Sequence, residues 1–116
     1  MTTLTLPWPP STNRLWRHWR GRTLLSAEGR AYRAAVARVC LESRCVRLGD
    51  AELTLVIDAW MPDRRRRDLD NLLKAAQDSM AHAGIFADDS QIVDLRIRRA
   101  GFDKVNPRLE CHLQAA

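Results

Sequence analysis

A run of eight residues combines two kinds of charge that suit the chemistry of phosphodiesters. Arg64 to Arg67 come directly before the segment Asp68-Leu69-Asp70-Asn71. The planar guanidinium group of arginine donates hydrogen bonds in a fixed geometry that matches phosphate. Closely spaced aspartates supply the oxygen ligands that Mg²⁺ prefers. The run could therefore hold a phosphate beside a metal ion, which is the minimum that a metal-dependent nuclease needs.

Each group of charges in this run also has a purely structural explanation. Asp68 and Asp70 fall at the expected start of a helix, where carboxylates can cap free N–H groups and interact favourably with the helix dipole. The arginines could form a solvated loop or a basic localisation patch. Asp70 and Lys74, four residues apart, could form a surface ion pair that contributes only about 0.3–0.5 kcal/mol. The same spacing could instead place an ammonium group beside a metal-bound phosphate.

A second pair of carboxylates, Asp88 and Asp89, comes shortly after the same helix should end. We expect the loop between this helix and the next strand to bring a third carboxylate back toward Asp68 and Asp70. Three carboxylates at close range would raise one another's pKa unless a cation neutralised them. Mg²⁺ can do so while it keeps water ligands for a substrate.

The elements that must position these residues follow from hydrophobic spacing. Alternating apolar residues predict strands at residues 3–6, 53–60, 93–98 and 109–113. Helical spacing predicts helices from residue 27 to about Arg44 and from residue 69 to 83. Ser26 and Asp68 are expected as N-caps, and Gly84 as the residue that ends the second helix. The order β-α-β-α-β-β predicts an α+β (or α/β) fold, with a mixed β-sheet and two helices in a single domain over residues 1–116.

Residues 7–25 are rich in proline, tryptophan and arginine, and we expect them to form an extended arm. The tryptophans of such an arm could stack on unpaired bases, or they could cover the edge of the core. We favour the core for Trp8, which follows a strand. For Trp16 and Trp19, both base stacking and packing against the core stay possible.

The composition favours a polyanionic partner. The chain of 116 residues has a formal charge of +5, and 17 of its 19 basic residues are arginine. A GC-rich genome would explain the preference for arginine but not the run of four. No membrane-spanning or secretory segment is expected, which suggests a cytoplasmic protein. Cys40, Cys45 and Cys111 contain no C-x-x-C pair, so we expect no zinc site and interpret Cys40 and Cys111 as buried and reduced.

The sequence also resembles the RusA family of Holliday-junction resolvases. The resemblance extends from about residue 4 to 98 and is most specific in the block from Met61 to Ala76, Met-Pro-Asp-Arg-Arg-Arg-Arg-Asp-Leu-Asp-Asn-Leu-Leu-Lys-Ala-Ala. Further matching segments are Leu6-Pro-Trp-Pro-Pro-Ser-Thr-Asn-Arg14, Gly21-Arg-Thr23, Ser26-Ala-Glu-Gly29 and Asp88-Asp-Ser-Gln91.

The resemblance implies specific roles and partners. It places metal-binding aspartates at Asp68, Asp70 and Asp89, a catalytic lysine at Lys74 and a DNA-contacting arginine at Arg67. We include Arg64, Arg65, Arg66 and Arg14 among the expected DNA-binding residues. The resemblance also implies a homodimer, dependence on Mg²⁺ (or Mn²⁺), paired nicks across a four-way DNA junction, and a bacterial or phage origin.

Three classes of function are therefore in contention. The first is a structure-selective, Mg²⁺-dependent endodeoxyribonuclease. The second is a non-catalytic basic nucleic-acid binding module, in which Asp68 and Asp70 only start a helix. The third is an interaction protein whose arginine loop binds an acidic partner.

Overall fold

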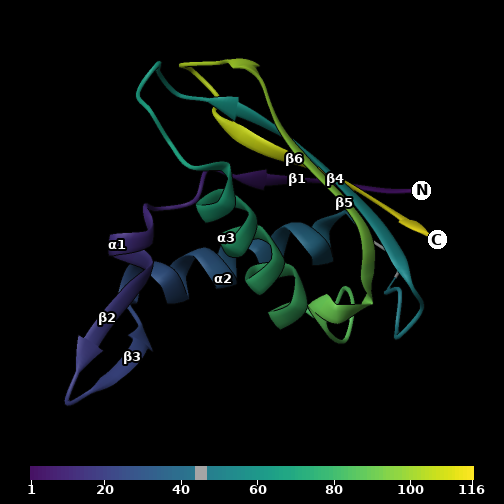
Figure 1. Cartoon of the computed structure of the whole chain (residues 1–116), viewed down its shortest axis with the longest axis horizontal. Coiled ribbons are helices and arrows are strands. Elements are labelled where there is room, and N and C mark those ends of the chain that lie inside the picture. Colours follow the sequence, from purple (N-terminus) through teal and green to yellow (C-terminus); the bar gives the residue numbers. More distant parts are fainter. Residues whose placement is uncertain (44–46) are drawn as a thin grey trace.

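A four-stranded mixed sheet forms one layer of the computed structural model, which describes residues 1–43 and 47–116 (Figure 1). Its strands are β1 (Thr2–Pro7), β4 (Leu53–Met61), β5 (Ile92–Phe102) and β6 (Arg108–Ala115), in the spatial order β1-β6-β4-β5. β6 runs antiparallel to β1 and β4, whereas β4 and β5 are parallel. The four predicted strands and the mixed sheet are thus confirmed.

Two long helices, α2 (Ala27–Glu42) and α3 (Leu69–His82), lie on the same side of this sheet (Figure 1). Alternate residues of β4 are buried beneath them, and the intervening residues point to the opposite, uncovered face of the sheet. Ser26 caps α2 as predicted, because its hydroxyl accepts the Gly29 N–H. The expected end of this helix at Arg44, and Cys45, lie outside the described residues.

Helix α3 buries the stripe that its periodicity predicts, with one shift. Leu72, Ala76 and Met80 are buried, whereas Leu69 and Leu73 are only partly covered. Gly84 adopts a positive φ of 81° directly after the helix, which confirms its predicted role. Cys40 and Cys111 are buried in the core, also as predicted.

The prediction of an extended arm over residues 7–25 was wrong. This segment forms a one-turn helix α1 (Thr12–Leu15) and a hairpin of β2 (Trp16–Trp19) and β3 (Arg22–Leu25). The two turn residues both have positive φ, 48° at Arg20 and 73° at Gly21. Two-residue hairpin turns of this kind usually carry Asn or Asp before the glycine, and the unusual arginine explains why the sequence did not signal a hairpin.

The third predicted strand was placed correctly but ended too early. β5 continues through Gly101 to Phe102, and the glycine lets the Trp60 ring pack against the backbone: a Cβ would lie 2.8 Å from Trp60 Cζ3. β5 is also an edge strand. Consequently Val93 and Leu95 are 55% and 42% exposed although they alternate like core residues.

Gly29 permits the close approach of α2 to the base of the hairpin. A Cβ at this position would lie 2.6 Å from the Leu15 carbonyl oxygen and 2.7 Å from Leu25 Cδ1. Helix propensity alone would make Gly29→Ala stabilising by about 1 kcal/mol, but we expect overlap with the backbone to make it destabilising by ~1–3 kcal/mol. Denaturant unfolding measures the sign, with the exposed substitution Ala34→Ser as control. A more stable Gly29→Ala variant would show that the backbone at the base of the hairpin can move to accommodate the methyl group without loss of stability.

Candidate active site and DNA-binding groove

A groove of about 660 Å³ lies between the N-terminal segment and the arginine loop. Arg14 contributes from α1, Arg65 to Arg67 from the loop after β4, and Asp68 and Asn71 from the start of α3. The structure therefore gathers Arg14 with three of the four loop arginines, although some fifty residues of chain separate them. A groove with this density of guanidinium groups suits a phosphate backbone.

Arg67 is held in place by Asp63, a residue that the sequence analysis did not single out. Arg67 Nη1 lies 2.5 Å from Asp63 Oδ1, and Nη2 lies 3.1 Å from Oδ2. The Asp63 carboxylate also accepts the N–H of Arg65 at 2.9 Å. The Arg67 guanidinium, followed by that N–H, lowers the pKa of Asp63 to about 2. The Pro-Asp pair at residues 62–63 is a turn signal that could have identified this contact.

Two of the loop arginines also lie over aromatic rings. Arg67 Cζ is 5.6 Å from the centroid of Trp8, and Arg64 Cζ is 4.4 Å from that of Phe102. Trp8 packs against the core, as predicted, and its ring helps to line the groove. Arg64 is thus directed toward the end of β5, and the arginines that line the groove are Arg65 to Arg67.

The first turn of α3 presents two carboxylates beside this groove. Asp68 has the extended backbone of an N-cap, but its side chain makes no capping hydrogen bond. Its oxygens are therefore not consumed by the helix, contrary to the simple capping explanation. Asp70 is exposed, and its Oδ2 lies 3.9 Å from Lys74 Nζ. The two side chains are 73% and 67% exposed, so their ion pair contributes little to stability and leaves both available.

Asp89 begins the short helix η1 (Asp89–Gln91). This helix contacts α3 at the end away from the arginine loop (Figure 1). With 14 residues, α3 is about 21 Å long. Within the described part of the chain, Asp89 forms no three-ligand group with Asp68 and Asp70. The loop after α3 does not return toward Asp68 and Asp70, because Ile85 and Phe86 are buried in the core and hold the loop at the C-terminal end of the helix.

Neighbouring Asp88 is engaged within its own turn. The Ser90 hydroxyl donates a hydrogen bond to the Asp88 carboxylate and thereby holds its pKa below the usual range. Gln91 accepts the N–H groups of Ala87 and Asp88, and it donates to the Gly49 carbonyl at 2.9 Å. Of the two adjacent carboxylates, Asp88 thus stabilises the conformation of the loop. Asp89 therefore stays the candidate metal ligand.

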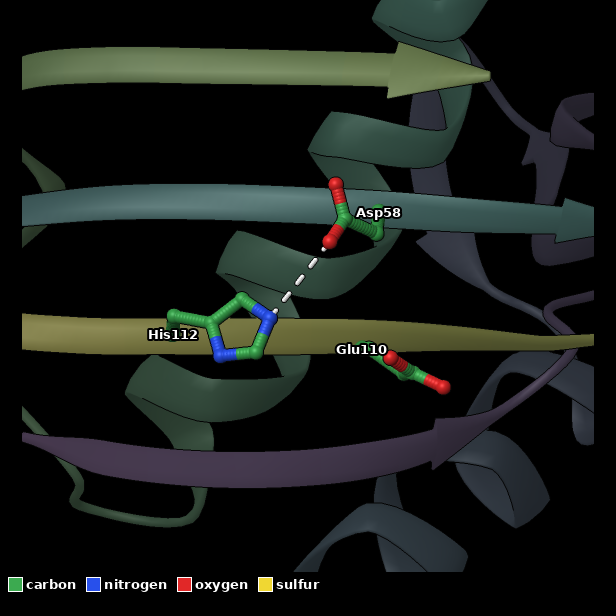
Figure 2. Close-up of side chains that lie close together, drawn as sticks. All are labelled: Asp58, Glu110 and His112. Carbon is green, nitrogen blue, oxygen red and sulfur yellow. Dashed lines mark ion pairs between the residues drawn. The ribbon is translucent and has the colours of Figure 1, made fainter. Parts of the chain in front are cut away.

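Figure 2 shows a cluster that the sequence analysis missed, formed by Asp58, Glu110 and His112 on the uncovered face of the sheet. Their potential ligand atoms lie within 4.8 Å of one another. Both carboxylates, however, already pair with arginines: Asp58 Oδ1 lies 2.6 Å from Arg98 Nε, and Glu110 Oε1 lies 2.9 Å from Arg108 Nε. Because a guanidinium group pairs with each of these carboxylates, and Arg108 also pairs with Asp103, we interpret the cluster as part of an ion-pair network that links β4, β5 and β6.

The network should make the free energy of unfolding depend on pH in the acid range. The hydrogen bond from Arg98, with a smaller effect of His112, lowers the pKa of Asp58. A carboxylate with a lowered pKa stabilises the fold above its unfolded pKa of about 4 and loses this effect as the pH falls through its folded pKa. We expect Asp58→Asn and Arg98→Gln to flatten the fall in unfolding free energy below pH ~4. Arg99→Gln is the control. An unchanged slope in both variants would contradict the network.

None of the described helices has the length and apolar character needed to cross a membrane.

Comparison with known proteins gives a consistent result. The family model described as Endodeoxyribonuclease RusA matches residues 7–114. The crossover junction endodeoxyribonucleases RusA of Escherichia coli strain K12 and of Enterobacteria phage 82 are 55% and 54% identical to this chain over 95 residues. Each alignment covers 81% of this chain and 78% of the relative. The chain belongs to the RusA family of endodeoxyribonucleases.

Proposed function

We propose that this protein resolves four-way DNA junctions by paired, metal-dependent nicks. The observation that carries the proposal is the groove in which Arg14 and Arg65 to Arg67 meet Asp68. The arginines would bind backbone phosphates and fix the position of the DNA without reading its sequence. The relatives are named for the cleavage of crossover junctions, and their bacterial and phage sources support a role on DNA in the cytoplasm.

The residues beside the groove fit a hard divalent cation. Asp68 and Asp70 offer carboxylate oxygens there, the ligands that Mg²⁺ and Mn²⁺ prefer, and Asp89 is the third candidate ligand although it lies at the opposite end of α3 in the same chain. When bound, such an ion would lower the pKa of a water molecule and polarise the phosphoryl oxygen. Lys74 would neutralise charge that develops on the phosphate. Arg67, held by Asp63, would orient the DNA strand beside the carboxylates.

The position of Asp89 supports a homodimer with shared active sites. One chain keeps Asp89 about a helix length, ~21 Å, from Asp68 and Asp70. A second copy could supply the missing carboxylate, so that the partner subunit's Asp89 completes each metal site. Exposed Val93 and Leu95 follow Asp89 on the edge strand β5 and offer an apolar surface for such a contact. Two sites related by a two-fold axis also match the paired cuts that a junction requires.

A synthetic four-way junction tests the function directly. We expect symmetric nicks in Mg²⁺, none with a chelator, and none on a linear duplex of the same sequence. Tight binding to the junction without cleavage in Mg²⁺ or Mn²⁺ would favour the second candidate, a non-catalytic DNA-binding module, which the arginine-lined groove could support by itself.

A further inference from the structure

The β2–β3 hairpin extends away from the sheet and the long helices (Figure 1). Its strands form a two-stranded sheet of their own. The pair at its base faces inward: Trp16 packs against the core, and its pairing partner Leu25 is half-buried. This inner face explains how the hairpin is attached to the body but leaves its outer face to be explained.

The outer face combines apolar and basic side chains that are exposed to solvent. Strand alternation places Arg17 and Trp19 of β2 on this face, together with their partners Leu24 and Arg22 of β3. Trp19 is 53% exposed and Leu24 is 37% exposed. An indole that keeps about half of its surface in water beside arginines is available for contact with a ligand, because an aromatic ring offers a large apolar face together with a polar N–H.

The hairpin is fixed well enough to present this face in one orientation. At its base, the Ser26 N–H donates to the Leu15 carbonyl at 2.8 Å, and Arg30 Nη1 donates to the Leu25 carbonyl at 3.0 Å. At its tip, Arg20 Cζ lies 5.4 Å from the centroid of the Trp19 ring. Trp19 is therefore presented next to the turn, on an anchored element.

The hairpin is also continuous with the groove. Arg14 lines the groove, and β2 begins two residues later. A DNA backbone held by Arg14 and Arg65 to Arg67 would meet Arg17 and then the tip of the hairpin. Arginine and an exposed aromatic ring in such a row are the means by which proteins hold unpaired nucleotides.

We propose that Trp19 recognises the branch point of the DNA by stacking on a base there, an inference that rests on the proposed junction cleavage. Inside a continuous duplex, both faces of each base are covered by their neighbours. A base with a free face exists only where stacking is interrupted, as at the centre of a four-way junction. Trp19 thus selects the branched structure, whereas the groove binds any phosphate backbone.

Paired binding measurements with Trp19→Ala test this role. Loss of one stacked base should weaken binding to a four-way junction about 5- to 150-fold, with affinity for a linear duplex unchanged. Trp19→Phe should recover much of the junction preference, because it restores an aromatic face. Leu41→Ala, which removes an exposed apolar side chain on α2, is the control. Sedimentation of each variant follows its oligomeric state.

Three results would overturn the inference: an unchanged junction affinity, an equal loss on junction and duplex, or a shift from dimer to monomer in Trp19→Ala. An unchanged junction affinity would show that the indole makes no contact with the DNA. An equal loss would show a general DNA contact, and a shift to monomer would show a contact between subunits. Cleavage by the parent protein keeps the two hypotheses separate. If the parent protein does not cut junctions, the proposed function is contradicted. If the parent cuts junctions and Trp19→Ala binds them as tightly as the parent, only this inference is contradicted.

Discussion

Asp70→Asn should abolish cleavage of a four-way junction while the protein folds and binds DNA normally. Asn is nearly isosteric with Asp, and the 73% exposed side chain leaves no cavity when it changes. The substitution removes the negative charge that would hold a divalent cation, so nicking should fall by several orders of magnitude. Without metal, binding should equal or exceed that of the parent, because one charge that repels the DNA backbone is gone.

Gel shift and nicking assays on one junction separate this outcome from a structural role. If Asp70 served only the helix start, Asn would cost a fraction of a kcal/mol at most and cutting would survive. Glu42→Gln, which removes an exposed carboxylate from the end of α2, is the matched control and should keep full activity. Intact cleavage by Asp70→Asn would remove the proposed metal site from consideration.

Two inactive variants should restore cleavage when they are combined in one dimer. In shared sites, a heterodimer of Asp70→Asn and Asp89→Asn carries both substitutions in the same site and leaves the other site intact. It should therefore nick one strand of a junction, although each homodimer is inactive. If each site came from one chain, both sites of the heterodimer would be damaged and no nick would appear.

The variants can be co-expressed with different tags and purified as the heterodimer. A heterodimer of Asp68→Asn and Asp70→Asn is the control, because it damages both sites in either arrangement. Nicking by the Asp70/Asp89 combination alone would locate the partner subunit's Asp89 in the site. Its absence, with both heterodimers confirmed by mass, would contradict the shared site.

The sequence by itself determined the features that depend on local periodicity. Alternation over residues 53–60 predicted β4, and the apolar stripe after Asp68 predicted α3. These predictions succeeded because side-chain direction repeats with a fixed period in each type of element. The position of Asp68 and Asp70 on the first helical turn followed from the same argument, as did the role of Gly84.

Only the tertiary structure decided how distant segments meet. It joined Arg14 to the arginine loop, exposed Leu95 on an edge strand, and separated Asp89 from Asp68 by the length of α3. Each of these depends on strand order or on the path of a loop. The path after α3 is set by burial of Ile85 and Phe86, a gain in apolar contact that no local pattern encodes. The hairpin was missed for a related reason, since Arg20 holds a positive φ that arginine seldom adopts.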